Sequence, residues 1–324
     1  MSQFVYLNDE LITVEEAKIS VLDHGFLYGN GLFETMRAYK NYHIFRLHQH
    51  LDRLFRSAEV IRLKIGYSLE IIEKAIVKTL AANGLANAGY VRLTISQGTG
   101  APGPDPTTCE KPTLLIVVKP FVPYPEVLYQ NGASAIVSSI RRNAQSPIPR
   151  LKSLNYLENI LARFQSRDVG AQESIFLDTD GYIAEGSMSN IFFVKSGELY
   201  TPSTGCPILP GITREVVLEI SSKIGITIRE GQWTLEQLLT ADEVFLTNSL
   251  MELMPLTRID SACINDGKPV RFAHRRRSDK DLVGTGRLTG GMTQELMALY
   301  KHQVEMEFQR MNKNCKRENG TPTA

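Results

Sequence analysis

The chain has 324 residues, of which 43% are hydrophobic and 22% charged, a globular composition long enough for two domains. Its formal net charge of +1 gives no electrostatic reason to expect nucleic acid or an anionic membrane as a partner. No apolar run is long enough to span a bilayer, the first residues lack a signal peptide, and the four cysteines form no paired motif. We therefore expect a cytoplasmic protein without a structural metal or a disulfide framework.

Residues 1–120 are predicted to form a small N-terminal α/β domain. A hairpin opens it, a glycine-rich loop leads into an alternating strand, and two helices precede two further strands. The predicted elements are the strands 4–7, 12–14, 90–96 and 113–119 and the helices 47–58 and 68–82. In the first helix Leu51 and Leu54 belong to an apolar stripe, and His50 and Arg53 lie beside that stripe.

The segment Gly98–Gly103 is a formal match to the dinucleotide-binding pattern GxGxxG. Pro102, Pro104 and Pro106 prevent the helix whose N-terminus would hold a pyrophosphate in that motif. We therefore predict a loop here and no nucleotide site.

A proline-rich run predicts an interdomain linker at residues 121–132, because closely spaced prolines stiffen the chain. Residues 133–311 then form a larger C-terminal domain, and residues 312–324 are predicted to be a disordered tail. The predicted elements of this domain are the strands 133–140, 174–178, 190–194 and 243–247 and the helices 153–168, 213–224 and 234–240. Short strands mixed with few helices predict an α+β fold rather than a doubly wound sheet.

Lys152 lies immediately before an apolar run, in which Leu154, Leu157, Leu161 and Phe164 recur with helical spacing. The preceding prolines keep the approach extended, so the lysine falls at a strand-to-helix corner. Most lysines are solvated surface residues. The neighbouring sequence motifs favour a functional role for this one.

Several features of the sequence complement this amine chemically. Glu185 offers a carboxylate in a predicted turn before an apolar strand, and Arg53 offers a fork-shaped cation suited to phosphate. Ile212 and Thr213 open a predicted helix, whose free amides form an anion site. An amine, a carboxylate and a phosphate cradle together are what pyridoxal 5′-phosphate requires. Each piece alone also has an ordinary reading, as a turn carboxylate, an exposed helix arginine or a helix entry.

A series of motifs over about residues 3–262 gives this combination a family context. The motifs are Asp23-His24-Gly25 with Tyr28-Gly29 and Phe33-Glu34, His50-Leu51-Asp52-Arg53-Leu54, Arg150-Leu151-Lys152-Ser153, Glu185-Gly186 with Ser189-Asn190, Leu209-Pro210-Gly211-Ile212-Thr213-Arg214, and Ala241-Asp242-Glu243. In this order they resemble the fold-type IV, or class IV, pyridoxal-phosphate enzymes. That family contains branched-chain aminotransferases, D-amino acid aminotransferases and aminodeoxychorismate lyases.

The resemblance implies a two-domain homodimer of the D-amino acid aminotransferase-like architecture, with the cofactor in the cleft between the domains. It implies that Lys152 binds the cofactor covalently and that Glu185 is the partner of the pyridine nitrogen. The other cofactor-binding residues that it implies are Arg53, Tyr156, Ile212, Thr213, Ser249 and Leu250. Tyr156 falls where branched-chain aminotransferases place a tyrosine near the phenolic oxygen of the cofactor.

Two reactions compete within the family. Thr35 stands where lyases carry threonine and branched-chain aminotransferases usually carry glycine, and Asn248–Met251 resembles the lyase pattern. Tyr90-Val91-Arg92 fits the Tyr-Ile-Arg of branched-chain aminotransferases, although some lyases keep this arginine. The loop Gly98–Gly103 lacks the arginine and histidine of D-amino acid aminotransferases, and an intact Lys152 argues against a catalytically inactive binding protein.

The sequence therefore favours a 4-amino-4-deoxychorismate lyase, which forms p-aminobenzoate and pyruvate for folate synthesis, with a branched-chain aminotransferase as the alternative. In the lyase reading Lys152 is the catalytic base, and Lys152 or a group near Thr35 supplies the proton. The candidate substrate residues are Tyr28, Phe33, Arg37, Tyr90, Arg92 and Arg142. The segment 263–292 departs from all three branches of the family and suggests no role.

Overall fold

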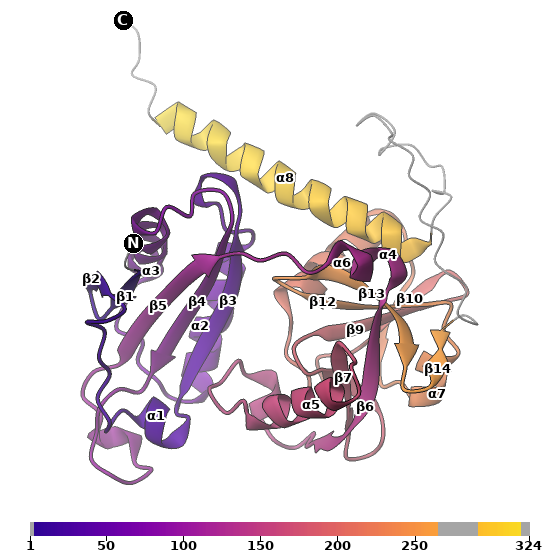
Figure 1. Cartoon of the computed structure of the whole chain (residues 1–324), viewed down its shortest axis with the longest axis horizontal. Helices are drawn as coiled ribbons and strands as arrows, with labels where there is room; N and C mark the ends of the chain where they lie inside the picture. Colours follow the sequence, from indigo (N-terminus) through magenta and orange to yellow (C-terminus); the bar gives the residue numbers. More distant parts are fainter. Residues whose placement is uncertain (1–2, 265–290, 319–324) are drawn as a thin grey trace, which may run out of the picture. The chain divides into compact units, whose positions relative to one another are not determined.

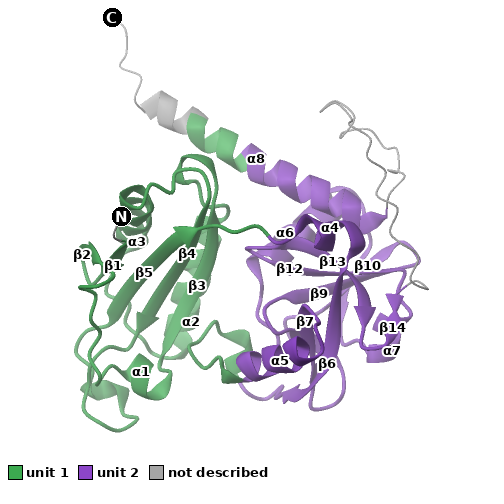
Figure 2. Ribbon diagram, viewed as in Figure 1, with its two compact units in different colours: residues 1–123, 147–157, 307–324 green, residues 124–146, 158–306 purple. Residues whose placement is uncertain are grey.

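A computed structural model of the chain describes residues 3–264 and 291–318 (Figure 1). Most of the segment 263–292 therefore lies outside the described residues. The chain divides into two compact units (Figure 2), of which the first comprises residues 1–123, 147–157 and 307–324. The second unit comprises residues 124–146 and 158–306. The first break falls inside the predicted linker. The segment around Lys152 and residues 307–311 belong to the first unit, although the sequence predicted them in the C-terminal domain.

The first unit is built on a five-stranded antiparallel sheet with the order β2-β1-β5-β4-β3. Its strands are β1 (Phe4–Leu7), β2 (Glu10–Thr13), β3 (Gly31–Ala38), β4 (Gly89–Ser96) and β5 (Thr113–Pro120). Its helices are α1 (His24–Tyr28), α2 (Leu47–Val60) and α3 (Leu69–Ala82). The predicted hairpin, strands and helices of this region are confirmed. The segment Gly98–Gly103 is a loop between β4 and β5, as predicted.

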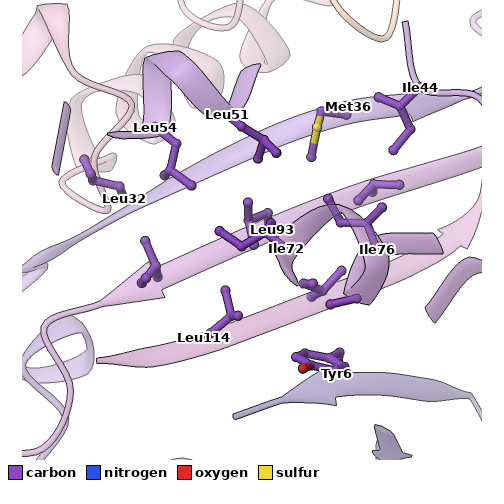
Figure 3. Packing of buried hydrophobic residues seen from close by; sticks show 14 of the residues in the cluster. Tyr6, Leu32, Met36, Ile44, Leu51, Leu54, Ile72, Ile76, Leu93 and Leu114 are labelled. Carbon is purple, nitrogen blue, oxygen red and sulfur yellow. The ribbon is translucent and has the colours of Figure 1, made fainter. Parts of the chain in front are cut away.

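The core of the first unit lies on one face of this sheet, where α2 and α3 cover it (Figure 3). Every second residue of β3, such as Leu32 and Met36, points into this core and meets Leu51 and Leu54 of α2. The intervening residues of β3 therefore lie on the opposite face of the sheet. That face carries the polar residues with which the functional site begins.

The backbone around Lys152 pairs with β3, which is the edge strand of the sheet. The amide of Phe33 donates to the carbonyl of Lys152 at 2.8 Å, and the amide of Leu154 donates to the carbonyl of Gly31 at 2.9 Å. The prediction of a helix from residue 153 is therefore wrong at its start, and α5 runs from Leu157 to Asp168. Residues 152–154 use their backbone groups in sheet pairing, which a helical turn does not permit.

The second unit contains a mixed sheet with the order β11-β10-β9-β12-β13-β6-β7-β8, and β14 pairs with β13 beside this path. Its strands are β6 (Ala133–Arg142), β7 (Glu173–Asp178), β8 (Ile183–Gly186), β9 (Asn190–Lys195), β10 (Glu198–Pro202), β11 (Ile228–Gly231), β12 (Glu243–Asn248), β13 (Glu252–Ile259) and β14 (Ala262–Cys263). Its helices are α4 (Glu126–Asn131), most of α5, α6 (Ile212–Lys223) and α7 (Leu235–Leu239). Both units combine helices with a sheet, antiparallel in the first and mixed in the second, which confirms the α+β class.

The apolar residues that recur with helical spacing in α5 lie on its exposed side. Leu157, Leu161 and Phe164 are exposed, whereas Asn159 and Ala162 are buried. The buried side packs through polar bonds and small side chains: the Asn159 amide donates to the carbonyl of Ser187, and the carbonyl of Ala162 accepts a bond from Ser174. This helix therefore presents its apolar stripe outward in the isolated chain.

Three further local predictions are corrected. Glu185 lies inside β8, and the turn follows it. The short helix α4 occupies part of the predicted linker. The last helix, α8 (Met292–Glu318), includes residues that were predicted to be a disordered tail, and its first amides are capped by the carboxylate of Glu243. None of the helices within residues 3–264 and 291–318 is long and apolar enough to cross a membrane.

Candidate functional site

Lys152 contacts an aromatic side chain of the strand with which it pairs. Its amine lies 4.6 Å from the centre of the Phe33 ring, and the Arg92 guanidinium lies 3.9 Å from the centre of the same ring. The ring of Tyr156 meets Phe33 edge-on at 5.3 Å. The first unit thus gathers an amine and a phenol from one stretch of sequence, and a guanidinium from another, around an aromatic ring of a third.

The face of the sheet opposite the core carries most of the predicted substrate residues. Thr35 and Arg37 alternate with the core residues of β3, and in the register of β3 with β4 they lie opposite Arg92 and Tyr90. The guanidinium of Arg37 lies 4.1 Å from the centre of the Phe121 ring. The side chains of a strand alternate between its two faces. One surface of the sheet therefore carries Phe33, Thr35, Arg37, Tyr90 and Arg92.

Tyr28 belongs to α1 and has a different local role. Its hydroxyl accepts a hydrogen bond of 2.6 Å from the amide of Gly103, so it connects α1 to the loop between β4 and β5. Buried Asp23 caps α1 by accepting bonds from the amides of Gly25 and Phe26.

Arg53 is buried on the core side of the sheet. It is therefore not the exposed helix arginine that was the alternative interpretation of the sequence. Its Nε and Nη2 donate to the carboxylate of Glu34 at 2.8 and 2.6 Å. His50 also bonds to this carboxylate, with Nδ1 2.8 Å from Oε2. Glu34 was not among the predicted site residues, although an acidic residue at a core-facing position of an alternating strand was a visible signal.

Glu185 is held in the second unit by a backbone amide and a guanidinium. The amide of Leu209 donates to Oε2 at 2.9 Å, and Nη2 of Arg142 donates to Oε1 at 3.4 Å. The other end of the Arg142 guanidinium donates to Glu158 at 2.7 Å, and its plane lies 4.0 Å from the centre of the Phe176 ring. The observed partners of Arg142 are thus carboxylates of the protein itself, whereas the sequence analysis proposed a substrate carboxylate.

The N-terminus of α6 supplies buried amides at Ile212 and Thr213. Gly211 is its N-cap residue and has no side chain to accept bonds from the first amides of the helix, which point out of it. A side chain at Gly211 would place Cβ 1.9 Å from Oδ1 of Asn190, which requires glycine there. The helix entry therefore has the geometry of an anion site.

The turn that contains Ser249 and Leu250 is fixed by Asn248. Its Oδ1 accepts bonds from the amides of Leu250 and Met251 at 2.9 and 2.8 Å, and its Nδ2 donates to the carbonyl of Met188 at 3.0 Å. Asn248 therefore connects this turn to the one that follows Glu185. From the sequence, Asn248 was only part of a family motif, and this structural role was not predicted.

These donor groups fit pyridoxal 5′-phosphate in kind. The first unit supplies the amine of Lys152, the guanidinium of Arg53 and the phenol of Tyr156, and the second supplies the carboxylate of Glu185 and the α6 entry. An amine on a pinned backbone and an anchored carboxylate are the groups that hold the reactive end and the ring nitrogen of this cofactor.

Comparison with known proteins agrees with this chemistry. The family model described as "Amino-transferase class IV" matches residues 31–259. The chain is 41% identical over 263 residues to a Methanocaldococcus jannaschii protein provisionally named a branched-chain-amino-acid aminotransferase, covering 81% of the chain and 90% of the relative. It is 35% identical to the aminodeoxychorismate lyase of Bacillus subtilis, covering 93% of the chain and 94% of the relative.

Solved structures give the same result. The fold is similar to that of the T.th. branched-chain amino acid aminotransferase with pyridoxamine 5′-phosphate, with a TM-score of 0.81, 31% identity and 94% of each chain covered. The Escherichia coli branched-chain amino acid aminotransferase gives a TM-score of 0.78 at 33% identity, covering 82% of this chain and 90% of that one. With a family match over most of its length and relatives of this similarity, the chain belongs to the class IV aminotransferase family.

Proposed function

We propose that the protein is a pyridoxal-phosphate-dependent branched-chain amino acid aminotransferase. The observation that carries the proposal is the pair of Lys152 and Arg92 on one Phe33 ring, because an amino acid substrate needs an amine-reactive centre and a cation for a carboxylate. The comparisons also favour the transaminase, since branched-chain aminotransferases predominate among the most similar relatives and structures. The lyase, which the sequence motifs favoured, becomes the second candidate.

Lys152 has the central role in this proposal. The bound cofactor supplies an aldehyde for the substrate amine and a ring that withdraws electrons from the reacting carbon. The Nζ of Lys152 holds the cofactor between turnovers and then takes the proton from the α-carbon of the substrate. The pairing of its backbone with β3 fixes the position of the Lys152 main chain. A fixed main chain favours a constant distance between the amine and the reacting carbon.

Glu185 keeps a proton on the pyridine nitrogen in this proposal. Its carboxylate is oriented by the amide of Leu209 and by Arg142. We therefore reassign Arg142 from substrate binding to the support of Glu185. The phosphate would be held by Arg53, by Ile212 and Thr213 at the start of α6, and by the turn at Ser249 and Leu250.

The substrate would lie against the open face of the first sheet. Arg92 would bind a carboxylate, and Phe33, Tyr90 and Tyr156 would offer apolar and phenolic surface to the side chain. Tyr28 and Arg37 stay candidate substrate residues, with Arg37 oriented by its stacking on Phe121. A guanidinium stacked on an aromatic ring keeps its edges available for a planar carboxylate.

Aminodeoxychorismate lyase is the second candidate because of one specific observation. Thr35 lies directly opposite Arg92 on the open face, where a hydroxyl could supply a proton to a leaving oxygen beside a bound carboxylate. The Bacillus subtilis lyase also matches the chain over 93% of its length. In this reading Thr35→Gly should lower the release of p-aminobenzoate by about tenfold, near 1.4 kcal/mol of barrier.

The two reactions are separated by one experiment on the purified protein. We expect leucine and 2-oxoglutarate to give glutamate, with no p-aminobenzoate formed from aminodeoxychorismate. Stoichiometric p-aminobenzoate and pyruvate without any 2-oxo acid would overturn the transaminase and support the lyase. Borohydride should fix the cofactor to the peptide that contains Lys152, and a label on another lysine would overturn the shared site.

A homodimer is also part of the proposal. The apolar stripe of α5 is exposed in the single chain, and exposed stripes of this kind mark interaction sites. A second exposed group surrounds α1 in the first unit and consists of Ile19, Val21, Leu22, Phe26 and Leu27. A second copy of the chain would cover such surfaces. A cytoplasmic location remains a prediction from the sequence.

A further inference from the structure

Glu34, His50 and Arg53 form a charged cluster on the core side of the first sheet, and we call it the Glu34 cluster. Glu34 comes from β3, and the other two residues lie three positions apart on α2, so they share one face of that helix. The Glu34 side chain is almost completely buried, and Arg53 and His50 are nearly as inaccessible. Their neighbours on the same strand and helix, such as Leu32 and Leu54, are aliphatic.

The charges within the cluster are set by burial and by these contacts. Burial alone would raise the pKa of Glu34, but the charge of Arg53 and the bonds from His50 and Arg53 lower it to about 2. Burial lowers the pKa of His50, with the bond and charge of Glu34 acting in the opposite direction. The cluster therefore holds one carboxylate, one guanidinium and a neutral imidazole near neutral pH.

Stability alone is a weak reason for such a cluster. A buried ion pair is expensive to desolvate, and hydrophobic residues of similar volume often replace it without loss. The surrounding aliphatic side chains would accommodate such a replacement. A buried pair is better explained when one member must be presented to something else in a fixed orientation.

The contacts define that orientation. Glu34 accepts bonds from Nε and Nη2, which form one edge of the planar guanidinium. Nη1 lies at the opposite side of the plane, and the rigid fork prevents it from turning independently. His50 bonds to Oε2 of Glu34, so the carboxylate itself is held from a second side.

We propose that Glu34 is a positioning residue that turns the Arg53 guanidinium so that its Nη1 side faces the cofactor phosphate, with His50 locking Glu34. This inference rests on the proposed role of Arg53 in binding phosphate. It adds a specific requirement: a carboxylate that never touches the cofactor controls phosphate affinity through Arg53 alone.

The test compares the affinity of the apoprotein for pyridoxal 5′-phosphate with its affinity for pyridoxal, which lacks the phosphate. The wild type is compared with Arg53→Ala, Glu34→Gln and the double variant. We expect Arg53→Ala to weaken pyridoxal 5′-phosphate binding about ten- to a hundredfold and Glu34→Gln at least about fivefold. Pyridoxal binding should change less than about twofold in all variants, and the double variant should match Arg53→Ala.

The outcomes separate the two claims. If Arg53→Ala leaves both affinities unchanged, the proposed phosphate role of Arg53 fails. If Arg53→Ala acts as expected, four results for Glu34→Gln would overturn only the positioning role. Pyridoxal 5′-phosphate affinity could stay unchanged or rise, pyridoxal affinity could fall equally, or the loss in the double variant could be the full sum of the two single losses. Thr79→Val is a matched control, because Thr79 is buried in α3 and, within the described residues, its hydroxyl donates only to the carbonyl of Ala75.

His50→Gln provides a second test if Glu34→Gln fails to fold. This variant keeps the charges of Glu34 and Arg53 and disturbs the contact that locks Glu34. We expect pyridoxal 5′-phosphate binding to weaken about two- to threefold with pyridoxal binding unchanged, as for the loss of one modest hydrogen bond. Unchanged pyridoxal 5′-phosphate binding would overturn the role of His50 and, without a folded Glu34→Gln, the positioning proposal.

Discussion

Helices α2 and α5 carry apolar stripes of the same spacing, yet one buries its stripe and the other exposes it. In α2, Leu51 and Leu54 are buried against the first sheet. In α5, Leu161 and Phe164 are exposed, and small or polar residues such as Ala162 face inward. The same periodic signal therefore has opposite consequences in the two units.

The difference comes from what each helix packs against. The strand β3 presents aliphatic side chains to α2, so the stripe finds an apolar partner. The groups near β7 and β8 that face α5 are polar. The carbonyl of Ser187 accepts a bond from Asn159, and the hydroxyl of Ser174 donates to the carbonyl of Ala162. The period fixes which residues share a face, and the partner element decides which face is buried.

The largest expected effect tests this comparison directly. Leu51→Ala in α2 should lower the free energy of unfolding by about 2–5 kcal/mol, because it opens a cavity in a fully packed core. Leu161→Ala in α5 should change it by less than about 0.5 kcal/mol at concentrations where the chain is monomeric. Urea unfolding of both variants measures this contrast, and equal losses would show that α5 buries its stripe.

The buried charges between α2 and β3 give the next largest effect, which appears as acid sensitivity. The pKa of Glu34 is lowered from 4.5 to about 2, so the native state binds fewer protons than the unfolded state. Glu34 therefore contributes on the order of 3 kcal/mol of stability above about pH 5, lost as the pH falls toward 2. The lowered pKa of His50 acts in the same direction, because unfolded His50 binds its proton first as the pH falls below about 6.5.

Urea unfolding as a function of pH measures this contribution. The free energy of unfolding should fall steeply between about pH 5 and pH 2 in the wild type and less steeply in Glu34→Gln. A variant that loses stability on acidification as steeply as the wild type would contradict the lowered pKa of Glu34.

The inward face of α5 should respond to added volume, although its outward face tolerates change. Ala162→Leu inserts three carbons into a buried contact and should cost about 1–3 kcal/mol in the free energy of unfolding. Arg167→Leu, on the exposed side of the same helix, is the control and should stay within about 0.5 kcal/mol. Thermal unfolding of both variants measures this difference, and a neutral Ala162→Leu would contradict the tight packing of this face.

The smallest expected change in folding concerns the outward stripe itself. Phe164→Ser should alter the unfolding of the monomer by less than about 0.5 kcal/mol, because this ring is already exposed. It should weaken the proposed homodimer by at least about tenfold, since a buried aromatic residue contributes about 1.5–3 kcal/mol to a contact. Sedimentation over a range of concentrations measures the dimer, and an unchanged dissociation constant would place the interface elsewhere.

Local sequence patterns were enough to predict the family and the α+β class, whereas the roles assigned to the site residues stay predictions. The order of the motifs around Lys152, Glu185 and Gly211–Arg214 predicted the class IV family, which the family match confirms. The helix α2, the opening hairpin and the loop Gly98–Gly103 also followed from local patterns. These features depend on neighbouring residues, whose spacing is written directly in the chain.

The hydrogen bonds between segments far apart in the chain could not be predicted from local patterns. Residues 152–154 are paired to β3 and not helical, because an edge strand more than a hundred residues earlier takes their backbone groups. Glu34 became the partner of Arg53 because β3 lies beneath α2, and α5 turned its apolar stripe outward because its neighbours offered polar groups. Periodicity predicts which side chains of one element share a face. The arrangement of the elements in space sets which residues those side chains contact.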